Sequence, residues 1–285
     1  MFSYLAFFIF ILGSVVGSFL NVVILRYRKN SVLGRSACTK CGKTLRWFEL
    51  IPVLSFLAQG GRCKRCKTSI SWQYPLVEVL TGTLFVALFY FLVDFYQVKT
   101  VYNFPFFPFI FSFLSLGTVW STLVVIFVYD LYHKIIPDKF VFIFISFSLV
   151  WLFNSVNSDT LLSLPMLMDF LMGFILFSFF ASLWYFSKGT WMGFGDAKLA
   201  IGMGFLLGFS KGFVAFMLAF WVGAGVSLVL LLLKKVMNRF ENKKIPLFLK
   251  ELGLKSEVPF APFLILGTFI AFFFAVDVLD LVSFF

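Results

Sequence analysis

The sequence predicts an all-α polytopic membrane protein with about eight transmembrane helices. Hydrophobic residues make up 61% of the chain and charged residues only 13%, and the mean hydropathy is +0.99. A soluble domain does not reach these values. Apolar stretches of about 20 residues, the length needed to cross about 30 Å of hydrocarbon, recur along the chain. Basic residues gather in alternate loops, as they do in proteins that cross a membrane repeatedly.

Dividing the chain at its polar interruptions gives eight predicted spans, at residues 3–25, 76–97, 105–129, 138–154, 161–186, 197–209, 212–234 and 259–284. The first is read as a retained helix and not as a signal peptide, because no basic residue precedes it and no small-x-small cleavage site follows it. The sixth is short, since about 13 helical residues cover only about 20 Å. Such an element is tolerated where protein surrounds it or where it borders a water-accessible cavity.

These spans divide the chain into three predicted parts. Residues 1–26 form the first transmembrane helix, and residues 27–75 form a cytoplasmic loop domain that contains four cysteines. Residues 76–285 form a seven-helix membrane domain with a basic cytoplasmic loop at 235–258.

The basic residues predict the orientation of the chain. Of the 24 lysines and arginines, 22 fall in loops on one side of the predicted membrane, and only Lys99 and Lys211 lie opposite. Loops rich in Lys and Arg stay in the cytoplasm, so both termini are expected to face outward. The net charge of +11 is then a property of the cytoplasmic face. It favours contact with anionic lipid, and no feature of the sequence indicates nucleic-acid binding.

All four cysteines lie in the predicted cytoplasmic loop, as two Cys-x-x-Cys pairs: Cys38, Cys41, Cys63 and Cys66. Two close pairs of thiolates suit tetrahedral zinc, and the 21 residues between the pairs are close to zinc-ribbon spacing. Disulfide or redox chemistry is the competing interpretation, although cytoplasmic thiols usually stay reduced. Four protein ligands would make the zinc structural, and the loop is too short to fold without it.

Two aspartates at the ends of predicted spans are the candidate catalytic residues. Asp130 ends the third span and Asp196 begins the sixth, so both are expected at the cytoplasmic boundary. Ionisable groups in such positions are costly and mark functional sites. Structural roles compete with this interpretation: Asp130 could pair with Lys134, and Asp196 could cap a helix. Asp138 directly follows Pro137 and is expected to favour the start of a helix.

Several segments together resemble the bacterial type IV prepilin peptidases over nearly the whole chain. They are Gly17-Ser18-Phe19-Leu20-Asn21-Val22-Val23 with Arg26, the two cysteine pairs, Tyr74-Pro75-Leu76-Val77-Glu78, Asp130 with Ile136-Pro137-Asp138, and Gly193-Phe194-Gly195-Asp196-Ala197-Lys198. The resemblance implies a multi-pass protein of the bacterial inner membrane with a GxGD aspartic endopeptidase activity, which removes the basic leader of prepilins and pseudopilins. It also implies methylation of the new N-terminus from S-adenosylmethionine. Asp130 and Asp196 correspond to the catalytic pair of the family.

These assignments lead to an expected mechanism. Asp130 and Asp196 would share one proton, because two like charges cannot both ionise cheaply when they are close, and together they would activate water. Gly193 and Gly195 lack Cβ atoms, so they would let the substrate backbone approach. Asp138 and Glu78 are expected to make the mouth of the site acidic and attract the leader, with Lys198 beside them. No Gly-x-Gly-x-x-Gly segment follows a strand, so the S-adenosylmethionine site that the resemblance implies would be a non-Rossmann pocket between the cysteine loop and the membrane.

Other interpretations stay open at this point. A preflagellin-type or presenilin-like protease would share the aspartate pair but not the four-cysteine loop. An ion-coupled transporter would need acidic groups nearer the middle of the membrane. A zinc-dependent scaffold would leave Gly-Phe-Gly-Asp unexplained. His133 is expected to be a surface residue, Asn21 to hydrogen-bond a neighbouring helix, and the glycines at 202, 204, 208, 223 and 225 to serve helix packing.

Overall fold

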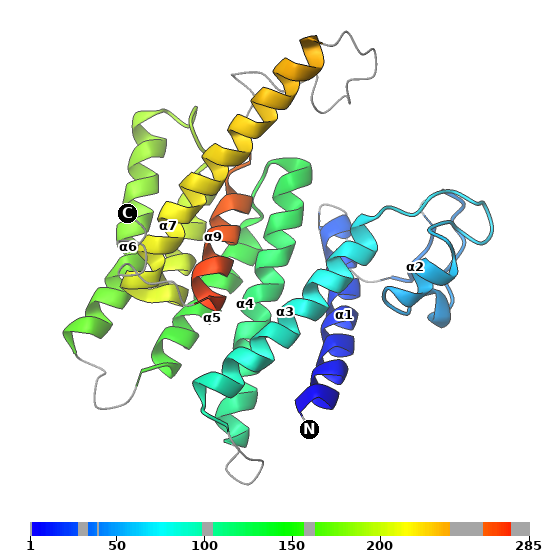
Figure 1. Cartoon of the computed structure of the whole chain (residues 1–285), viewed down its shortest axis with the longest axis horizontal. Coiled ribbons are helices and arrows are strands. Elements are labelled where there is room, and N and C mark those ends of the chain that lie inside the picture. Colours follow the sequence, from blue (N-terminus) through cyan, green and yellow to red (C-terminus); the bar gives the residue numbers. More distant parts are fainter. Residues whose placement is uncertain are drawn as a thin grey trace. The chain divides into compact units, whose positions relative to one another are not determined.

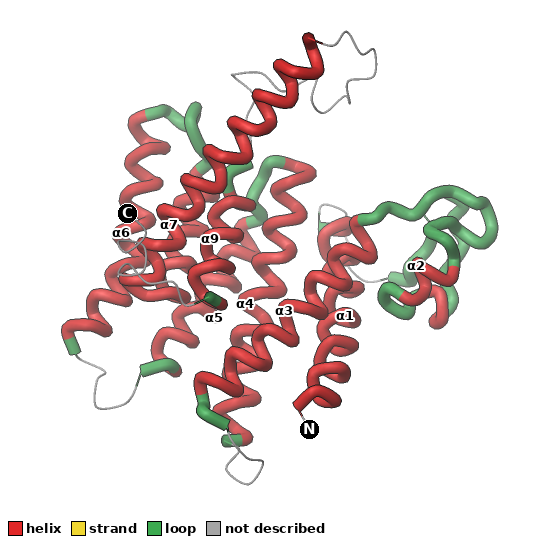
Figure 2. The backbone as a smooth tube through the Cα atoms, in the orientation of Figure 1, coloured by secondary structure: helices red, strands yellow, loops and turns green. Residues whose placement is uncertain are grey.

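A computed structural model describes residues 2–27, 34–38, 40–98, 105–156, 163–239 and 259–274. In this part of the chain the backbone forms helices and loops, with two isolated β-bridges (Figure 2). The predicted basic loop at 235–258 lies largely outside the described residues. The elements, labelled in Figure 1 where there is room, are α1 (Phe2–Arg26), η1 (Trp47–Glu49), α2 (Leu54–Ala58), α3 (Gln73–Phe95), α4 (Phe106–His133), α5 (Asp138–Asn154), α6 (Leu164–Phe186), α7 (Phe194–Arg239) and α9 (Ala261–Phe273).

Five of these helices are long and apolar enough to cross a membrane: Ser3–Arg26, Gln73–Phe95, Phe106–His133, Leu164–Phe186 and Phe194–Leu232. They confirm the predicted class of all-α, multi-pass membrane protein. α5 and α9 occupy the fourth and eighth predicted spans, but they have only 17 and 13 residues. Residues 275–285, which end the eighth predicted span, lie outside the described part.

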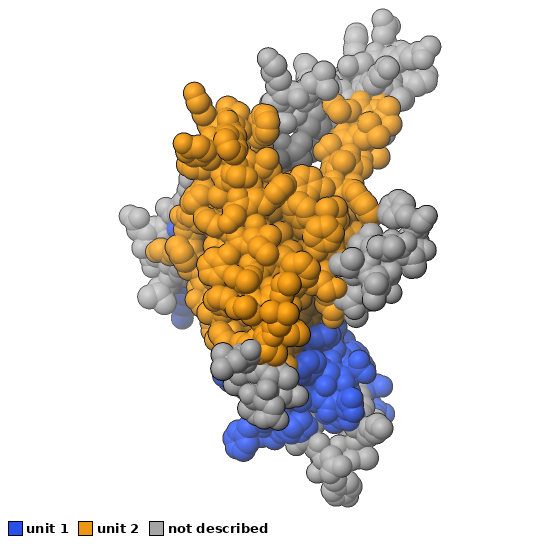
Figure 3. All heavy atoms as spheres, turned by 90° about the vertical axis from the view of Figure 1, so that its left-hand side faces the viewer, with its two compact units in different colours: residues 1–128 blue, residues 129–285 orange. Residues whose placement is uncertain are grey.

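The chain divides into two compact units, Met1–Val128 and Tyr129–Phe285 (Figure 3). The boundary falls inside α4, so the last turn of this helix belongs to the second unit. Each unit has its own packed helices, α1 with α3 in the first and α5, α6 and α9 with α7 in the second.

In the first unit α1 and α3 pack closely because small residues line their contact. A Cβ atom on Gly13 would lie 2.8 Å from Phe85, and one on Gly17 would lie 2.9 Å from the Glu78 backbone. The side-chain amide of Asn21 donates a hydrogen bond of 3.1 Å to the Tyr74 carbonyl, which confirms the predicted link between helices. This pairing fixes the start of α3 against the end of α1.

In the second unit α7 is the central helix, and α5, α6 and α9 all pack against it. Glycines on α7 allow these approaches. A Cβ atom on Gly202 would collide with Phe144 of α5, and one on Gly204 would collide with the backbone of Gly173 of α6. The predicted packing role is therefore confirmed for Gly202 and Gly204, whereas a Cβ atom on Gly225 would meet nothing within 4 Å and Gly208 lies at a break in the helix.

The long helix α7 is broken at Gly208, where φ is 72° and ψ is −170°. Only glycine adopts this conformation readily. The break frees the backbone N–H of Phe209, and Asp169 of α6 accepts a hydrogen bond from it at 2.7 Å. The sixth and seventh predicted spans are thus the two halves of α7, and a carboxylate from a neighbouring helix caps the second half.

Candidate active site and metal centre

The two candidate aspartates belong to the second unit and are both buried. Asp130 lies in the last turn of α4 and is 4% exposed, and Asp196 lies in the first turn of α7 and is 6% exposed. Their carboxylates are close enough for their charges to interact. The fold therefore brings together two acidic groups that are 66 positions apart in the sequence.

Among the described residues Asp130 makes no ion pair with Lys134, which was the structural role considered for it. In the described part of the chain, the contact of Lys134 with Asp130 is a backbone hydrogen bond of 2.8 Å, from the N–H of Lys134 to the carbonyl of Asp130. Oδ1 of Asp196 is buried without a hydrogen-bond partner. A buried, unpaired carboxylate oxygen is costly and is characteristic of a site that receives a ligand or water.

The two glycines before Asp196 have different surroundings. A Cβ atom on Gly195 would lie 2.9 Å from Cβ of Ile136, so glycine is needed there for the 135–137 segment to approach α7. A Cβ atom on Gly193 would meet nothing closer than Oδ2 of Asp196, at 3.8 Å. Gly193 thus borders open space beside the carboxylate, whereas Gly195 has a packing role.

Asp138 and Lys198 lie at the rim of this site and form an ion pair of 2.8 Å. The Asp138 side chain is 57% exposed, and Nζ of Lys198 also lies 5.3 Å from the centre of the Phe194 ring. His133 is exposed and stacks on Tyr129 with ring centres 4.2 Å apart, in agreement with its predicted surface position.

Glu78 belongs to the first unit, where it anchors the cysteine-bearing loop. Its Oε2 accepts a hydrogen bond of 2.7 Å from the backbone N–H of Val53. Val53 has a φ of 60°, which is unusual for a β-branched residue, so this bond holds a strained turn. The sequence predicted Glu78 as a boundary or site residue, and the contact with Val53 could not be predicted.

The four cysteines form one cluster in which all sulfur atoms lie within 4.8 Å of one another. The Sγ atoms of Cys38 and Cys66 are 3.7 Å apart, too far for a disulfide at about 2.05 Å. Four sulfurs at about 2.3 Å from a tetrahedral metal would be separated by about 3.8 Å. The cluster therefore has the geometry of a metal site, and its four cysteines are not paired as disulfides.

Two similar turns present these cysteines. In each, the first cysteine donates its backbone N–H to a residue five positions on: Cys38 to Lys43 and Cys63 to Thr68, both at 2.9 Å. Gly42 and Lys67 follow the second cysteines with φ values of 67° and 56°, and the bridges Ala37–Thr44 and Arg62–Ser69 close the turns. The repeated turn explains why two Cys-x-x-Cys pairs converge on one point.

Hydrogen bonds lower the pKa of the Cys66 and Cys38 thiols, which favours the thiolate form that binds metal. Those with the side chain and backbone of Thr68 lower the pKa of Cys66 to about 6, and the backbone of Cys41 and Lys40 lowers the pKa of Cys38. The backbone of Lys43 acts in the same direction on Cys41, but burial and its contacts with the other cysteines raise its pKa to about 11. Metal binding would displace this last proton, because only thiolates are ligands.

Glu49 is a further structural residue of the loop. Its side chain is 2% exposed, forms an ion pair of 3.2 Å with Lys43, and accepts a hydrogen bond of 2.9 Å from the backbone N–H of Arg46. The hydrogen bond from the Arg46 backbone is the main reason why the pKa of Glu49 lies below its usual value, and the contact with Lys43 acts in the same direction. The Glu49 carboxylate accepts from the backbone three residues earlier, as the acidic residue of a capping box does, but Arg46 lacks the acceptor side chain of that motif, so no sequence signal marked Glu49.

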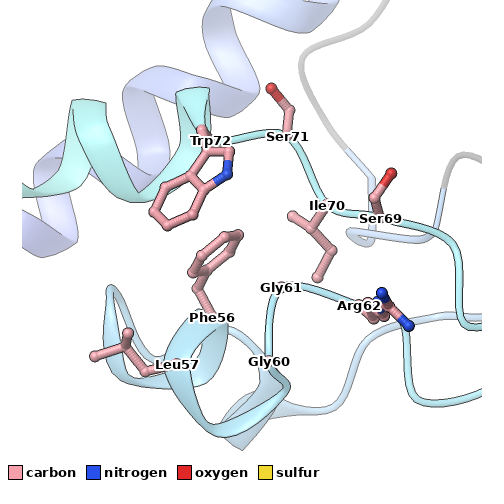
Figure 4. A pocket seen from close by; sticks show the side chains of 9 residues that line it. All are labelled: Phe56, Leu57, Gly60, Gly61, Arg62, Ser69, Ile70, Ser71 and Trp72. Atoms are coloured by element: carbon pink, nitrogen blue, oxygen red, sulfur yellow. The ribbon is translucent and has the colours of Figure 1, made fainter.

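A cavity of about 630 Å³ lies beside the second cysteine turn (Figure 4). In this view Phe56 of α2 points toward Trp72, with ring centres 4.9 Å apart, and Arg62 lies at the other end. Its remaining lining comes from two further loop segments, at 60–61 and 69–71, and from Leu57. The pocket is open to its surroundings, so it would cover only part of a small molecule.

Comparison with known proteins agrees with both parts of this description. Residues 11–92 match the Bacterial Peptidase A24 N-terminal domain, and residues 117–228 match the Type IV leader peptidase family. The first match includes the four cysteines, and the second includes Asp130 and Asp196. No solved structure matches the chain.

Several curated proteins named prepilin leader peptidase/N-methyltransferase are similar to this chain. The Pseudomonas aeruginosa protein is 30% identical over 291 positions, which cover 92% of this chain and 87% of that protein. The Bacillus subtilis protein is 27% identical over 95% of each chain. The Myxococcus xanthus protein is 55% identical over 84 residues, which cover 29% of this chain but only a quarter of that protein. On these matches and on the paired aspartates that the fold brings together, the chain belongs to the type IV leader peptidase family.

Proposed function

We propose that this chain is an aspartic endopeptidase of the inner membrane that removes the leader of type IV prepilins or pseudopilins, with Asp130 and Asp196 as its catalytic pair. One observation carries the assignment. The two carboxylates are buried within range of each other's charge, and an oxygen of Asp196 has no partner. A pair of neighbouring carboxyl groups that hold one proton can act as base and acid on the same peptide bond.

The reaction follows from this arrangement. The ionised carboxylate takes a proton from a water molecule while the water oxygen attacks the scissile carbonyl carbon. The protonated carboxyl then gives its proton to the amide nitrogen, and the C–N bond breaks. One product ends in a carboxyl group and the other begins with an amine, and the pair again holds one proton. No covalent intermediate is required.

The distribution of charged residues supports cleavage on the cytoplasmic side of the membrane and a substrate with a basic leader. The loops with most basic residues would lie in the cytoplasm and both termini outside, so the ends of α4 and α7 that carry the aspartates would face the cytoplasm. A basic leader would approach from there. Asp138 is half exposed at this rim, so its carboxylate can contact a basic residue of the leader although it also pairs with Lys198.

Substitution of each aspartate by asparagine tests the proposal. We expect Asp130→Asn and Asp196→Asn to lose at least about 100-fold in cleavage of a purified prepilin, because general acid–base catalysis contributes about that much or more. The readout is N-terminal sequencing of the product. Substantial cleavage by either folded variant would overturn the assignment.

Asp169→Asn is the matched control. This aspartate also lies in a membrane helix, but it caps the break in α7 and is not assigned to catalysis. An amide oxygen can still accept the bond from Phe209, so we expect cleavage to stay within a few-fold of that of the original protein.

We further propose that the four cysteines hold one structural zinc ion. The fit rests on the sulfur separations, on the two convergent turns and on the lowered pKa values of Cys38 and Cys66. With four protein ligands the metal would have no open position, so it would organise the loop and would not activate water. Elemental analysis of purified protein should find one zinc per chain, and Cys38→Ser should remove it.

The names of the relatives support a second activity, methylation of the new N-terminus. S-adenosylmethionine would supply the methyl group on a sulfonium cation. The pocket beside the second cysteine turn is the candidate site. The exposed ring of Trp72, which packs on the buried Phe56, offers an aromatic face to a cation, and Arg62 offers a partner for its carboxylate (Figure 4).

Calorimetry with S-adenosylmethionine tests this cavity without any turnover. Trp72→Ala and Arg62→Ala should each weaken binding at least tenfold, whereas Trp191→Ala, at an exposed tryptophan of the second unit, should not change it. Unaltered affinity in both cavity variants would exclude this cavity as the methyl-donor site, and cleavage by the aspartate pair would be unaffected.

A further inference from the structure

The segment from Trp47 to Leu57 has an unusual distribution of side chains for a loop outside the membrane helices. Its acidic residue is inside, because the Glu49 side chain is 2% exposed. Most of its large apolar residues are outside: Trp47 is 77% exposed, Leu54 64% and Leu57 65%, whereas Phe56 is 8% exposed. Leu50 and Ile51 are also exposed. A loop surrounded only by water would be expected to show the reverse arrangement.

A hydrogen bond fixes the segment 47–57 to α3, near the start of that helix. Val53, between η1 and α2, donates its backbone N–H to Glu78, which lies in the second turn of α3. α3 is one of the helices apolar enough to cross a membrane, and Leu76 near its start is 63% exposed. The exposed apolar residues of the segment are therefore held near the end of a surface that faces lipid. Figure 1 shows α2 beyond this end of α3, within the first unit.

The basic residues around the segment also favour a position at the membrane surface. Arg46 precedes Trp47 and is exposed, and Lys64 lies 5.1 Å from the centre of the Phe48 ring. Tryptophan prefers the headgroup level of a bilayer, where its ring is partly apolar and its N–H remains hydrated. Basic residues beside it are attracted to anionic headgroups. Aromatic, leucine and basic side chains together are typical of segments that lie in a membrane interface.

We propose that the exposed apolar residues Trp47, Leu50, Ile51 and Leu54 insert into the interface of the membrane, among anionic lipid headgroups. This interfacial segment rests on the bilayer beside α3, and the Glu78–Val53 bond sets its depth. The four-cysteine cluster, which flanks the segment on both sides in sequence, is thereby held at the membrane surface. The proposal is independent of the peptidase activity.

Fluorescence of Trp47 in the full-length protein tests the proposal. The protein is reconstituted in vesicles of phosphatidylethanolamine and phosphatidylglycerol, with and without lipid that carries a nitroxide at the headgroup. The emission of Trp47 is obtained as the difference between the original protein and Trp47→Phe. We expect nitroxide lipid to quench this component at least twofold more than acrylamide does. The corresponding difference for Trp120→Phe is the control, because Trp120 is 2% exposed and neither quencher should reach it.

Each other outcome would count against the proposal. If acrylamide quenches the Trp47 component and nitroxide lipid does not, the segment faces water and the proposal is wrong. If Trp47 becomes shielded only when a prepilin is added, the surface binds substrate and not lipid. Unchanged quenching in vesicles without phosphatidylglycerol would overturn the part played by anionic lipid. Leu54→Glu should reduce the nitroxide quenching in a protein whose zinc content is normal.

Discussion

Nζ of Lys198 lies 2.8 Å from Oδ1 of Asp138 and joins the first turn of α7 to the first turn of α5. Lys198 follows Asp196 by two residues, and Asp138 follows Asp130 by eight. The ion pair therefore connects the two segments that carry the candidate catalytic aspartates. Both side chains are partly exposed, so the pair contributes only about 0.2–1 kcal/mol to stability. We expect the ion pair to matter more for the relative position of the two aspartate-bearing segments than for the stability of the fold.

This relationship predicts different effects for its two members. Asp138→Asn should raise KM for a prepilin several-fold with little change in kcat, because its carboxylate is proposed to contact the basic leader. Lys198→Met should mainly lower kcat, since it releases the start of α7 beside Asp196. Steady-state kinetics on a purified prepilin gives both constants. An unchanged KM in Asp138→Asn would remove this residue from the substrate site.

The break in α7 leads to a second prediction. Asp169→Ala leaves the N–H of Phe209 without its partner and should destabilise the protein by about 0.5–2 kcal/mol, the usual cost of losing a helix cap. Gly208→Ala should cost about 1–3 kcal/mol, because φ of 72° with ψ of −170° suits only glycine and a Cβ atom would lie 2.6 Å from Oδ1 of Asp169.

Thermal unfolding in detergent measures both changes. Gly225→Ala is the matched control for Gly208, because a Cβ atom there would meet nothing within 4 Å. A loss of stability in Gly225→Ala as large as that in Gly208→Ala would mean that glycine is replaced poorly anywhere in α7, and the cap would not be the reason.

Sequence reasoning could predict the membrane class, the helix positions and the cysteine cluster, because each depends on residues that are close in the chain or on composition. Apolar length located α1, α3, α4, α5 and α6 to within a few residues of their observed ends. The short sixth span also indicated an interrupted helix, and α7 does break at Gly208.

The contacts that could not be predicted join residues distant in the sequence. Glu78 was recognised as an unusual carboxylate, but its partner is the backbone of Val53, 25 positions earlier, in a turn with positive φ. Asp169 lies inside a predicted span and could have been selected as an intramembrane acid. Its partner, the N–H of Phe209, lies 40 positions later and is available only because α7 breaks at Gly208. No local pattern specifies either pairing.

The buried Glu49 predicts a pH dependence of the cysteine loop. Its pKa in the folded loop is below the usual value of about 4.5, so its ionised form stabilises the fold. This stabilisation is fully present above about pH 4.5 and is lost as the pH falls through the lowered pKa of the folded state. The difference in stability between the original protein and Glu49→Gln should therefore be constant above that pH and shrink below it.

Limited proteolysis of the loop at a series of pH values measures this difference. Asp94→Asn, at an exposed acidic residue in the last turn of α3, provides a comparison for general effects of charge. If the susceptibility of Glu49→Gln differs from that of the original protein by the same factor at pH 3 as at pH 7, Glu49 does not stabilise the loop through its charge.

The two glycines before Asp196 provide a matched pair for the last prediction. Gly195→Ala places a Cβ atom 2.9 Å from that of Ile136, so the 135–137 segment must move and the two aspartates with it. We expect a loss of at least about tenfold in kcat, because catalytic groups that are misplaced by about 1 Å lose much of their effect.

Gly193→Ala has room for its methyl group in the free protein, and its thermal stability should be unchanged. The substrate backbone is expected to pass beside Gly193, so the added methyl group should raise KM for a prepilin. A normal KM in Gly193→Ala would show that the substrate approaches the carboxylates from another direction, whereas a normal kcat in Gly195→Ala would show that the Ile136 contact does not position them.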